Sequence, residues 1–128
     1  MSSYLLDTSV IIDTLNGKRN RDFLLRELLE EGHVLGCCAV NVAEVYAGMR
    51  PKEERGTERF LRSLEYHEIS WEAARRAGMF RRDYARRGVT LSLTDATIAA
   101  VAIEHDLILI TDNVKDFPMS DVSLHSLP

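Results

Sequence analysis

Short apolar runs recur along the chain at intervals that suit the strands of an α/β fold. Four of these runs have the length of a strand, and a fifth near the end is a candidate edge strand. The runs are "SYLL" (3–6), "HVLGCCAV" (33–40), "YHEIS" (66–70), "LILIT" (107–111) and "VSLHS" (122–126).

The stretches between these runs carry apolar residues at helical spacing instead. They predict helices over residues 8–17, 20–32, 42–49, 52–65, 71–88 and 92–106. Residues whose side chains favour helix N-caps stand where three of these helices begin: Thr8 or Ser9, Asn41 and Ser70. Strands and helices therefore alternate along most of the chain.

Two of the predicted helices have apolar residues on one face. In the helix over 20–32, the residues that recur at helical spacing are Phe23, Leu24, Leu28 and Leu29. In the helix over 71–88, one face carries Ala73, Ala77, Phe80 and Tyr84, and the opposite face carries Arg75, Arg82 and Arg86. The helix over 92–106 is apolar on most sides, which predicts a buried helix.

Strands that alternate with helices indicate an α/β protein with a mainly parallel central sheet of four to five strands and helices on both faces. The chain has 128 residues, which suits one domain. Sheets of this kind place their functional sites beyond the carboxyl ends of the strands. The residues that follow each strand are therefore the first candidates for chemistry.

The composition is that of an ordinary soluble globular protein, with 45% hydrophobic and 28% charged residues. No apolar run reaches the roughly 18 residues needed to span a bilayer. No basic segment precedes the first apolar stretch, as it would in a secretory signal. We therefore expect a cytoplasmic protein with no membrane segment. The adjacent Cys37 and Cys38 lie in an apolar run, which predicts buried free thiols.

The formal net charge of −4 is unevenly distributed. Residues 50–87 contain eleven Lys and Arg against seven Asp and Glu, so this part of the chain is basic. The arginines that lie opposite the apolar face of the helix over 71–88 are Arg75, Arg82 and Arg86. Their planar guanidinium groups suit the phosphates of a nucleic acid, although pairing with glutamates on a solvated helix face is the alternative.

Acidic residues follow or adjoin the predicted strands. Asp7 ends the first strand, and Asp112 directly follows "LILIT". Asp95 lies in the first turn of a helix, where a negative charge is favoured. Each of these three has an ordinary alternative as a helix cap or turn former, whereas Glu44 lies among apolar residues where unpaired carboxylates are rare.

Four carboxylates at one edge of a sheet repel one another unless a cation neutralises them. A site made only of oxygen ligands suits Mg²⁺ or Mn²⁺, with water completing the shell. The arrangement of Asp7, Glu44, Asp95 and Asp112 therefore favours a metal site.

Four motifs occur in the order and approximate spacing of the PIN-domain nucleases. They are "LLDTSVIID", "NVAEVYAGM", "LTDATIAAVAIEHDLILIT" and "TDNVKDF". Together they resemble most the VapC-type ribonuclease toxins of toxin–antitoxin pairs. The resemblance implies a three-layer PIN fold with residues 1–128 as a single domain. It also implies RNA cleavage that depends on Mg²⁺ or Mn²⁺, a homodimer, and inhibition by a cognate antitoxin.

The family's site residues carry over onto this sequence one by one. The first three acids match Asp7, Glu44 and Asp95. The fourth is Asp112 or Asp116, because Thr111 and the pair Asp116-Phe117 match the family pattern while Asp112 fills its variable position. Hydroxyls that could bind the acids or the scissile phosphate are those of Thr8, Ser9 and Thr111. Residues suited to a dimer contact are Tyr46, Met49 and Phe60.

Three other functions are weighed against this hypothesis. A haloacid-dehalogenase-like phosphatase needs a second Asp two residues after the first, where this chain has Ser9. A non-catalytic PIN module that binds RNA or protein has no reason to keep four repelling acids. A PIN-domain nuclease that is not a toxin remains open.

Overall fold

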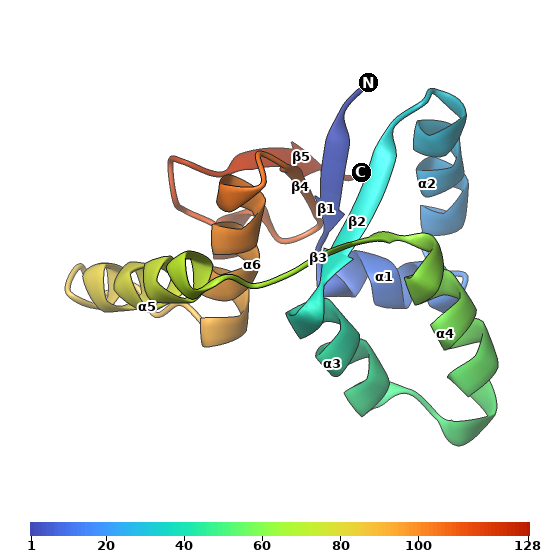
Figure 1. Cartoon of the computed structure of the whole chain (residues 1–128), viewed down its shortest axis with the longest axis horizontal. Helices are drawn as coiled ribbons and strands as arrows, with labels where there is room; N and C mark the ends of the chain where they lie inside the picture. The colour runs from blue at the N-terminus through green and yellow to red at the C-terminus, as the bar shows by residue number, and fades with distance from the viewer.

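Five parallel strands form the centre of the computed structural model, which describes residues 1–128 (Figure 1). The strands are β1 (Ser3–Leu6), β2 (Val34–Cys38), β3 (Glu65–His67), β4 (Ile108–Thr111) and β5 (Ser123–Ser126). Their order in the sheet is β3-β2-β1-β4-β5, and every neighbouring pair is parallel. The prediction of a mainly parallel sheet is confirmed, and the candidate strand near the end is an edge strand.

Six α-helices and two 3₁₀ turns connect the strands. The elements are α1 (Thr8–Leu15), α2 (Arg21–Glu30), α3 (Ala39–Gly48), η1 (Pro51–Glu53), α4 (Glu54–Ser63), α5 (Trp71–Ala85), α6 (Leu93–Glu104) and η2 (Val114–Asp116). Figure 1 shows α5 and α6 on one side of the sheet and α1, α2 and α4 on the other. None of these helices combines the length and the apolar character needed to cross a bilayer.

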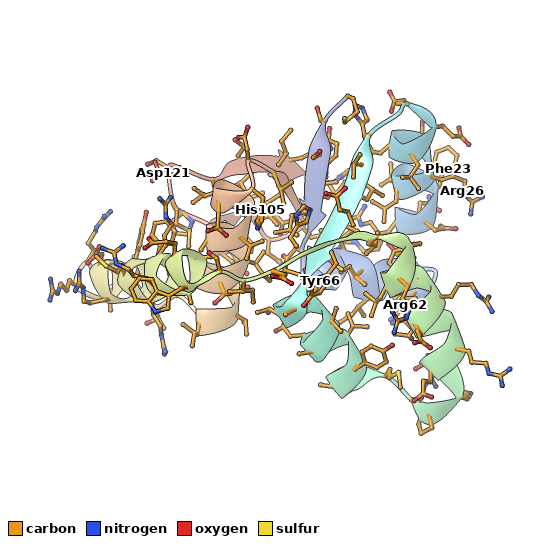
Figure 2. All side chains as sticks on the ribbon, in the orientation of Figure 1. Phe23, Arg26, Arg62, Tyr66, His105 and Asp121 are labelled. Carbon is orange, nitrogen blue, oxygen red and sulfur yellow. The ribbon has the colours of Figure 1, made fainter.

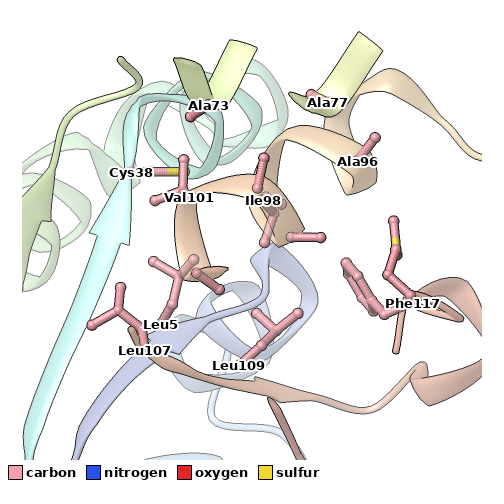
Figure 3. Packing of buried hydrophobic residues seen from close by; sticks show 14 of the residues in the cluster. Leu5, Cys38, Ala73, Ala77, Ala96, Ile98, Val101, Leu107, Leu109 and Phe117 are labelled. Atoms are coloured by element: carbon pink, nitrogen blue, oxygen red, sulfur yellow. The ribbon is translucent and has the colours of Figure 1, made fainter. Parts of the chain in front are cut away.

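Each face of the sheet has its own hydrophobic core. On the α5 and α6 side, Leu5 and Leu109 of the sheet pack with small residues of both helices, among them Ala73 and Ala77 (Figure 3). On the other side, Tyr4, Leu6 and Ile110 pack against α1, α2 and α4. Because side chains alternate along a strand, β1 is buried on both faces, which explains its continuous apolar sequence.

The structure corrects part of the expected apolar face of α2, where Leu28 packs against the core but Phe23 and Leu29 do not. Leu25 is its buried apolar residue, whereas Phe23 is 60% and Leu29 is 55% exposed. Figure 2 shows Phe23 and Arg26 on the outer side of the helix. Four leucines and a phenylalanine in ten residues match helical spacing in more than one phase, so periodicity alone did not select the buried face.

Two helix starts also differ from the prediction. Asp7, and not Thr8 or Ser9, is the N-cap of α1, and its side chain accepts a hydrogen bond from the backbone N–H of Thr8. Helix α3 begins at Ala39, so Asn41 lies inside its first turn and is not the N-cap. The N-cap at Ser70 is confirmed, because its hydroxyl accepts from the backbone N–H of Ala73 at 3.0 Å.

Candidate active site

The strand order reverses between β1 and β4, and this is where parallel sheets open a site beyond their carboxyl ends. Asp7 follows β1 at this point and is only 6% exposed. Its Oδ2 atom accepts a hydrogen bond from Oγ1 of Thr111, the last residue of β4, at 2.7 Å. Its Oδ1 atom accepts from the backbone N–H of Thr8 at 2.8 Å. The two strands and the start of α1 therefore fix the carboxylate of Asp7.

Glu44 reaches the same region from α3. The hydroxyl Oγ1 of Thr8, which directly follows Asp7, donates a hydrogen bond to Oε1 of Glu44 at 2.7 Å. One residue pair thus connects α1 with α3 at the carboxyl edge of the sheet. The hydroxyls of Thr8 and Thr111, both predicted to bind the acids or the scissile phosphate, thus each donate to an acid, Glu44 and Asp7 respectively.

Asp95 lies in the first turn of α6, after the N-cap Ser92. Burial raises the pKa of Asp95, and the nearby charges of Asp116 and Glu44 raise it further. Burial likewise raises the pKa of Asp7, against the lowering effect of its hydrogen bonds and with smaller raising effects from Asp95 and Glu44. The carboxylates of Asp7, Glu44, Asp95 and Asp116 therefore act on one another, and we call these four residues the acid cluster.

Asp112 is placed differently from the expectation that its side chain points towards the other acids. Its carboxylate forms an ion pair with the buried guanidinium of Arg21, and Arg19 approaches its second oxygen at 3.5 Å. The side chain of Asp112 is 7% exposed, so this pairing compensates a buried charge, while Oδ2 of Asp112 accepts no hydrogen bond. The neighbouring turn η2 instead carries Asp116 towards Asp95, with Phe117 buried in the core beside it.

Ser9, predicted to bind either the acids or the scissile phosphate, binds none of the acids. Its hydroxyl oxygen is buried and has no hydrogen-bond partner. Of the three hydroxyl residues proposed from the sequence, only Thr8 and Thr111 therefore bind an acid.

The acid cluster supplies only carboxylate oxygens, the ligands that suit Mg²⁺ or Mn²⁺. No three acidic, histidine or cysteine side chains stand close enough together to hold an ion among themselves. Mg²⁺ is commonly bound through one or two carboxylates, with water and substrate phosphates completing its shell. Burial is the largest cause of the raised pKa values of Asp7 and Asp95, and neighbouring carboxylates add to both, so a cation would relieve part of this cost. The donor set therefore fits a hydrated divalent ion.

The three arginines predicted to bind RNA are exposed, Arg75 and Arg82 on α5 and Arg86 at its C-cap. Arg75 is 3.9 Å from Glu72, and Arg82 is 3.2 Å from Asp83. Arg86 forms no ion pair. Helix α5 packs on α6, whose first turn carries Asp95 (Figure 1). The positions of these arginines are compatible both with binding of RNA phosphates and with ion pairing to acids on a solvent-exposed helix face.

Two functional candidates escaped the sequence interpretation. Asn41 is completely buried and donates from Nδ2 to the hydroxyl of Thr8 at 3.0 Å. Arg21 is 1% exposed and holds Asp112. An asparagine near a predicted helix start suggests only a cap, and an arginine in the polar stretch "GKRNRD" suggests only a solvated charge.

The reversal of strand order and the acids gathered at that point define an α/β protein with a carboxylate site at the switch point of its sheet. The chain belongs to the PIN-domain family, whose model matches residues 4–118. Within that family it belongs with the VapC ribonucleases, as the following relatives show.

Ribonuclease VapC19 from Mycobacterium tuberculosis is 32% identical over 115 residues, which are 90% of this chain and 92% of the relative. Ribonuclease VapC10 from the same organism is 38% identical over 116 residues, 90% of this chain and 86% of the relative. The crystal structure of VapBC2 from Rickettsia felis, bound to a DNA fragment from its promoter, contains a chain that superposes with a TM-score of 0.83. That chain is 22% identical, and the match covers 98% of this chain and 99% of the other. At this identity the structural likeness establishes the fold alone.

Proposed function

We propose that this protein is a VapC-type toxin, an endoribonuclease that depends on Mg²⁺ or Mn²⁺ and hydrolyses phosphodiester bonds in RNA. The observation that carries the proposal is the acid cluster at the switch point of the sheet, in a chain that shares 32–38% identity with VapC ribonucleases over nine tenths of its length. Solved structures of this fold include a toxin–antitoxin complex from Klebsiella pneumoniae and VapBC-5 from Mycobacterium tuberculosis, a member of a family of toxin–antitoxin systems. We extend the proposal to inhibition of this chain by a cognate antitoxin.

The acid cluster would hold the metal, one or two of its carboxylates directly and the others through bound water. Its members are Asp7, Glu44, Asp95 and Asp116. Such an ion supplies an acidified water as nucleophile and neutralises charge that develops on the phosphate. Thr111 keeps one oxygen of Asp7 in place through its hydroxyl, and Thr8 does the same for Glu44. Both contacts fix the orientation of a carboxylate that the proposal takes as a metal ligand.

The direct test is cleavage of single-stranded RNA by the purified protein with and without Mn²⁺. We expect cleavage with Mn²⁺ and none after treatment with EDTA. In the absence of RNA, Mn²⁺ should also raise the melting temperature, because a ligand that binds the native state stabilises it. Undiminished cleavage in EDTA would contradict the metal-dependent reaction.

Two alternatives predict other results in this assay. A non-catalytic PIN module that binds RNA or protein would leave the RNA intact even with Mn²⁺. A haloacid-dehalogenase-like phosphatase would release phosphate from a monoester, but Ser9 stands where its second Asp is needed and contacts no acid.

The fourth acid can be identified by comparing Asp116→Asn with Asp112→Asn. We expect Asp116→Asn to weaken Mn²⁺ binding at least tenfold, about 1.4 kcal/mol, because the charge of this carboxylate acts on Asp95. Asp112→Asn should change Mn²⁺ affinity less than twofold and lower stability instead, since it removes the partner of Arg21. Calorimetric titration with Mn²⁺ measures both affinities, and a larger loss for Asp112→Asn would reverse the assignment.

Phosphate binding by α5 predicts how RNA affinity depends on salt. If Arg75, Arg82 and Arg86 each contact a phosphate, every single Ala substitution should reduce the log–log salt slope by roughly 0.7 for a single strand. Arg62→Ala on α4 is a matched control, because Arg62 is also exposed but pairs with Glu58 at 2.9 Å. Slopes that stay equal in all variants would assign the α5 arginines to a solvated face.

The proposal includes a homodimer. The residues suggested for its contact, Tyr46, Met49 and Phe60, are all partly exposed on or beside α3 and α4. Light scattering at micromolar concentration should give twice the chain mass of 14.5 kDa. A mass of one chain would contradict the dimer.

A further inference from the structure

A continuous series of hydrogen bonds connects the end of β2 to Glu44. The backbone N–H of Cys38 donates to Oδ1 of Asn41 at 2.8 Å. Nδ2 of Asn41 donates to Oγ1 of Thr8 at 3.0 Å, and that hydroxyl donates to Oε1 of Glu44 at 2.7 Å. Asn41 is 0% exposed, so no water competes for its amide group.

The direction of every bond in this series is determined by the chemistry of its donors. A backbone N–H can only donate, so the atom of Asn41 that faces Cys38 is its oxygen. The amide NH₂ group therefore faces Thr8, and it too can only donate. The hydroxyl of Thr8 accepts this bond, which directs its single proton to Glu44. The backbone at Cys38 thus sets the orientation of a hydroxyl on α1.

We propose that Asn41 is a positioning residue that aims the Thr8 hydroxyl at Glu44 and so holds one carboxylate oxygen of the acid cluster. This inference rests on the proposed function, because it takes Glu44 as one of the working acids. A glutamate side chain loses more rotamer freedom on ordering than most residues. The bond from Thr8 fixes Oε1 when the protein folds, and the second oxygen of Glu44 stays available for a metal or a water. The loss of side-chain entropy then occurs on folding and not on metal binding.

A purely structural role for Asn41 makes a different prediction. If its only task is to accept from Cys38 at the start of α3, then Asn41→Asp keeps the necessary oxygen, and the folded variant should cleave like the parent even if the buried charge lowers its stability. In the proposed role, Asn41→Asp replaces the NH₂ donor by an acceptor. The proton of Thr8 then turns towards residue 41, and Glu44 loses its bond.

The experiment compares Asn41→Asp, Thr8→Val and Thr8→Ser with a control variant on α1, the helix that carries Thr8. Thr14→Val is that control, because the hydroxyl of Thr14 donates to the carbonyl of Val10 at 2.8 Å and touches no acid. With Mn²⁺, the single-turnover cleavage rate should fall roughly 10- to 100-fold in Asn41→Asp and Thr8→Val, the range for groups that orient metal ligands. RNA affinity should change less than twofold.

Two comparisons separate positioning from general damage. Thr8→Ser restores the hydroxyl, so its rate should recover to within about threefold of the parent, and Thr14→Val should cleave like the parent. Parental rates in both Asn41→Asp and Thr8→Val would overturn the proposal. If Asn41→Asp does not fold, Thr8→Val alone decides, because it adds no charge.

A second measurement needs neither metal nor RNA. The side-chain NH₂ protons of Asn41 are buried and bonded to Thr8, so NMR should show them exchanging slowly with solvent. Thr8→Val should speed this exchange at least tenfold, while Thr14→Val leaves it unchanged. Equal exchange in Thr8→Val and the parent would overturn the hydrogen-bond series itself. A parent that fails to cleave RNA, with the exchange result as expected, would instead refute the proposed function.

Discussion

Replacing Asp95 by asparagine should lower the rate of RNA cleavage by at least about 100-fold and leave the protein folded. Loss of a group that only orients a metal ligand costs about 10- to 100-fold, and Asp95 is proposed as a ligand itself. The backbone N–H of Asp95 donates to Oγ of Ser92 at 3.0 Å, and the substitution preserves this cap of α6. Single-turnover cleavage with saturating Mn²⁺ is the measurement.

Stability should respond in the opposite direction to activity. Because burial and the charges of Asp116 and Glu44 raise the pKa of Asp95, its ionised form disfavours the folded state at pH 7. Metal-free Asp95→Asn should therefore melt at or above the temperature of the parent. The difference should shrink as the pH falls through the pKa of Asp95, where the parent's carboxyl becomes neutral. Mn²⁺ should stabilise the parent more than the variant.

Asp7→Asn should lose cleavage to a similar extent, but it is the less selective variant. The carboxylate of Asp7 also accepts from Thr8 and Thr111, so its replacement disturbs the N-cap of α1 and the link to β4. Parental cleavage by Asp95→Asn would contradict the metal site. A low melting temperature of Asp95→Asn would show that the residue serves the fold instead.

The sheet and the acids that follow its strands were predictable because both depend on local sequence and on topology. β1 and β4 are buried on both faces, so each reads as an unbroken apolar run. Parallel strands bring their carboxyl ends to one edge, which places Asp7 near the start of α3 and α6 without any knowledge of distances. The same reasoning predicts that Glu44 and Asp95 join it.

The partners of individual side chains were not predictable in the same way. Asp112 follows β4 as directly as Asp7 follows β1, yet its charge is satisfied by Arg21, 91 residues away in the sequence. Asn41 was predicted as the N-cap of a helix, but it lies three residues after the N-cap Cys38, where its oxygen accepts from the Cys38 backbone and its NH₂ group binds Thr8. The local sequence pattern contains no information about which of two neighbouring acids, Asp112 or Asp116, pairs with an arginine that is distant in the sequence.

The pair of Arg21 and Asp112 should be the most costly ion pair to break in this protein. Arg21 is 1% exposed, and its Nη2 atom also donates to the carbonyl of Pro128 at 2.9 Å, so one guanidinium joins α2, the end of β4 and the last residue. Arg21→Met keeps the length of the side chain but leaves the buried carboxylate of Asp112 without its main partner. Removing one member of a buried pair costs about 3–5 kcal/mol.

Urea unfolding at pH 7 should therefore show Arg21→Met destabilised by about 3 kcal/mol, the lower end of that range because Arg19 remains 3.5 Å from Asp112. Arg26→Met is the matched control on the same helix. Arg26 is 69% exposed and 3.8 Å from Asp22, and exposed pairs of this kind contribute less than about 1 kcal/mol. Adding Asp112→Asn to Arg21→Met removes the unpaired charge and should recover at least half of the lost stability. If the double variant is no more stable than Arg21→Met, the cost lies in lost packing around α2 and not in the buried charge, because the second substitution removes that charge and, besides it, only the pair with the exposed Arg19.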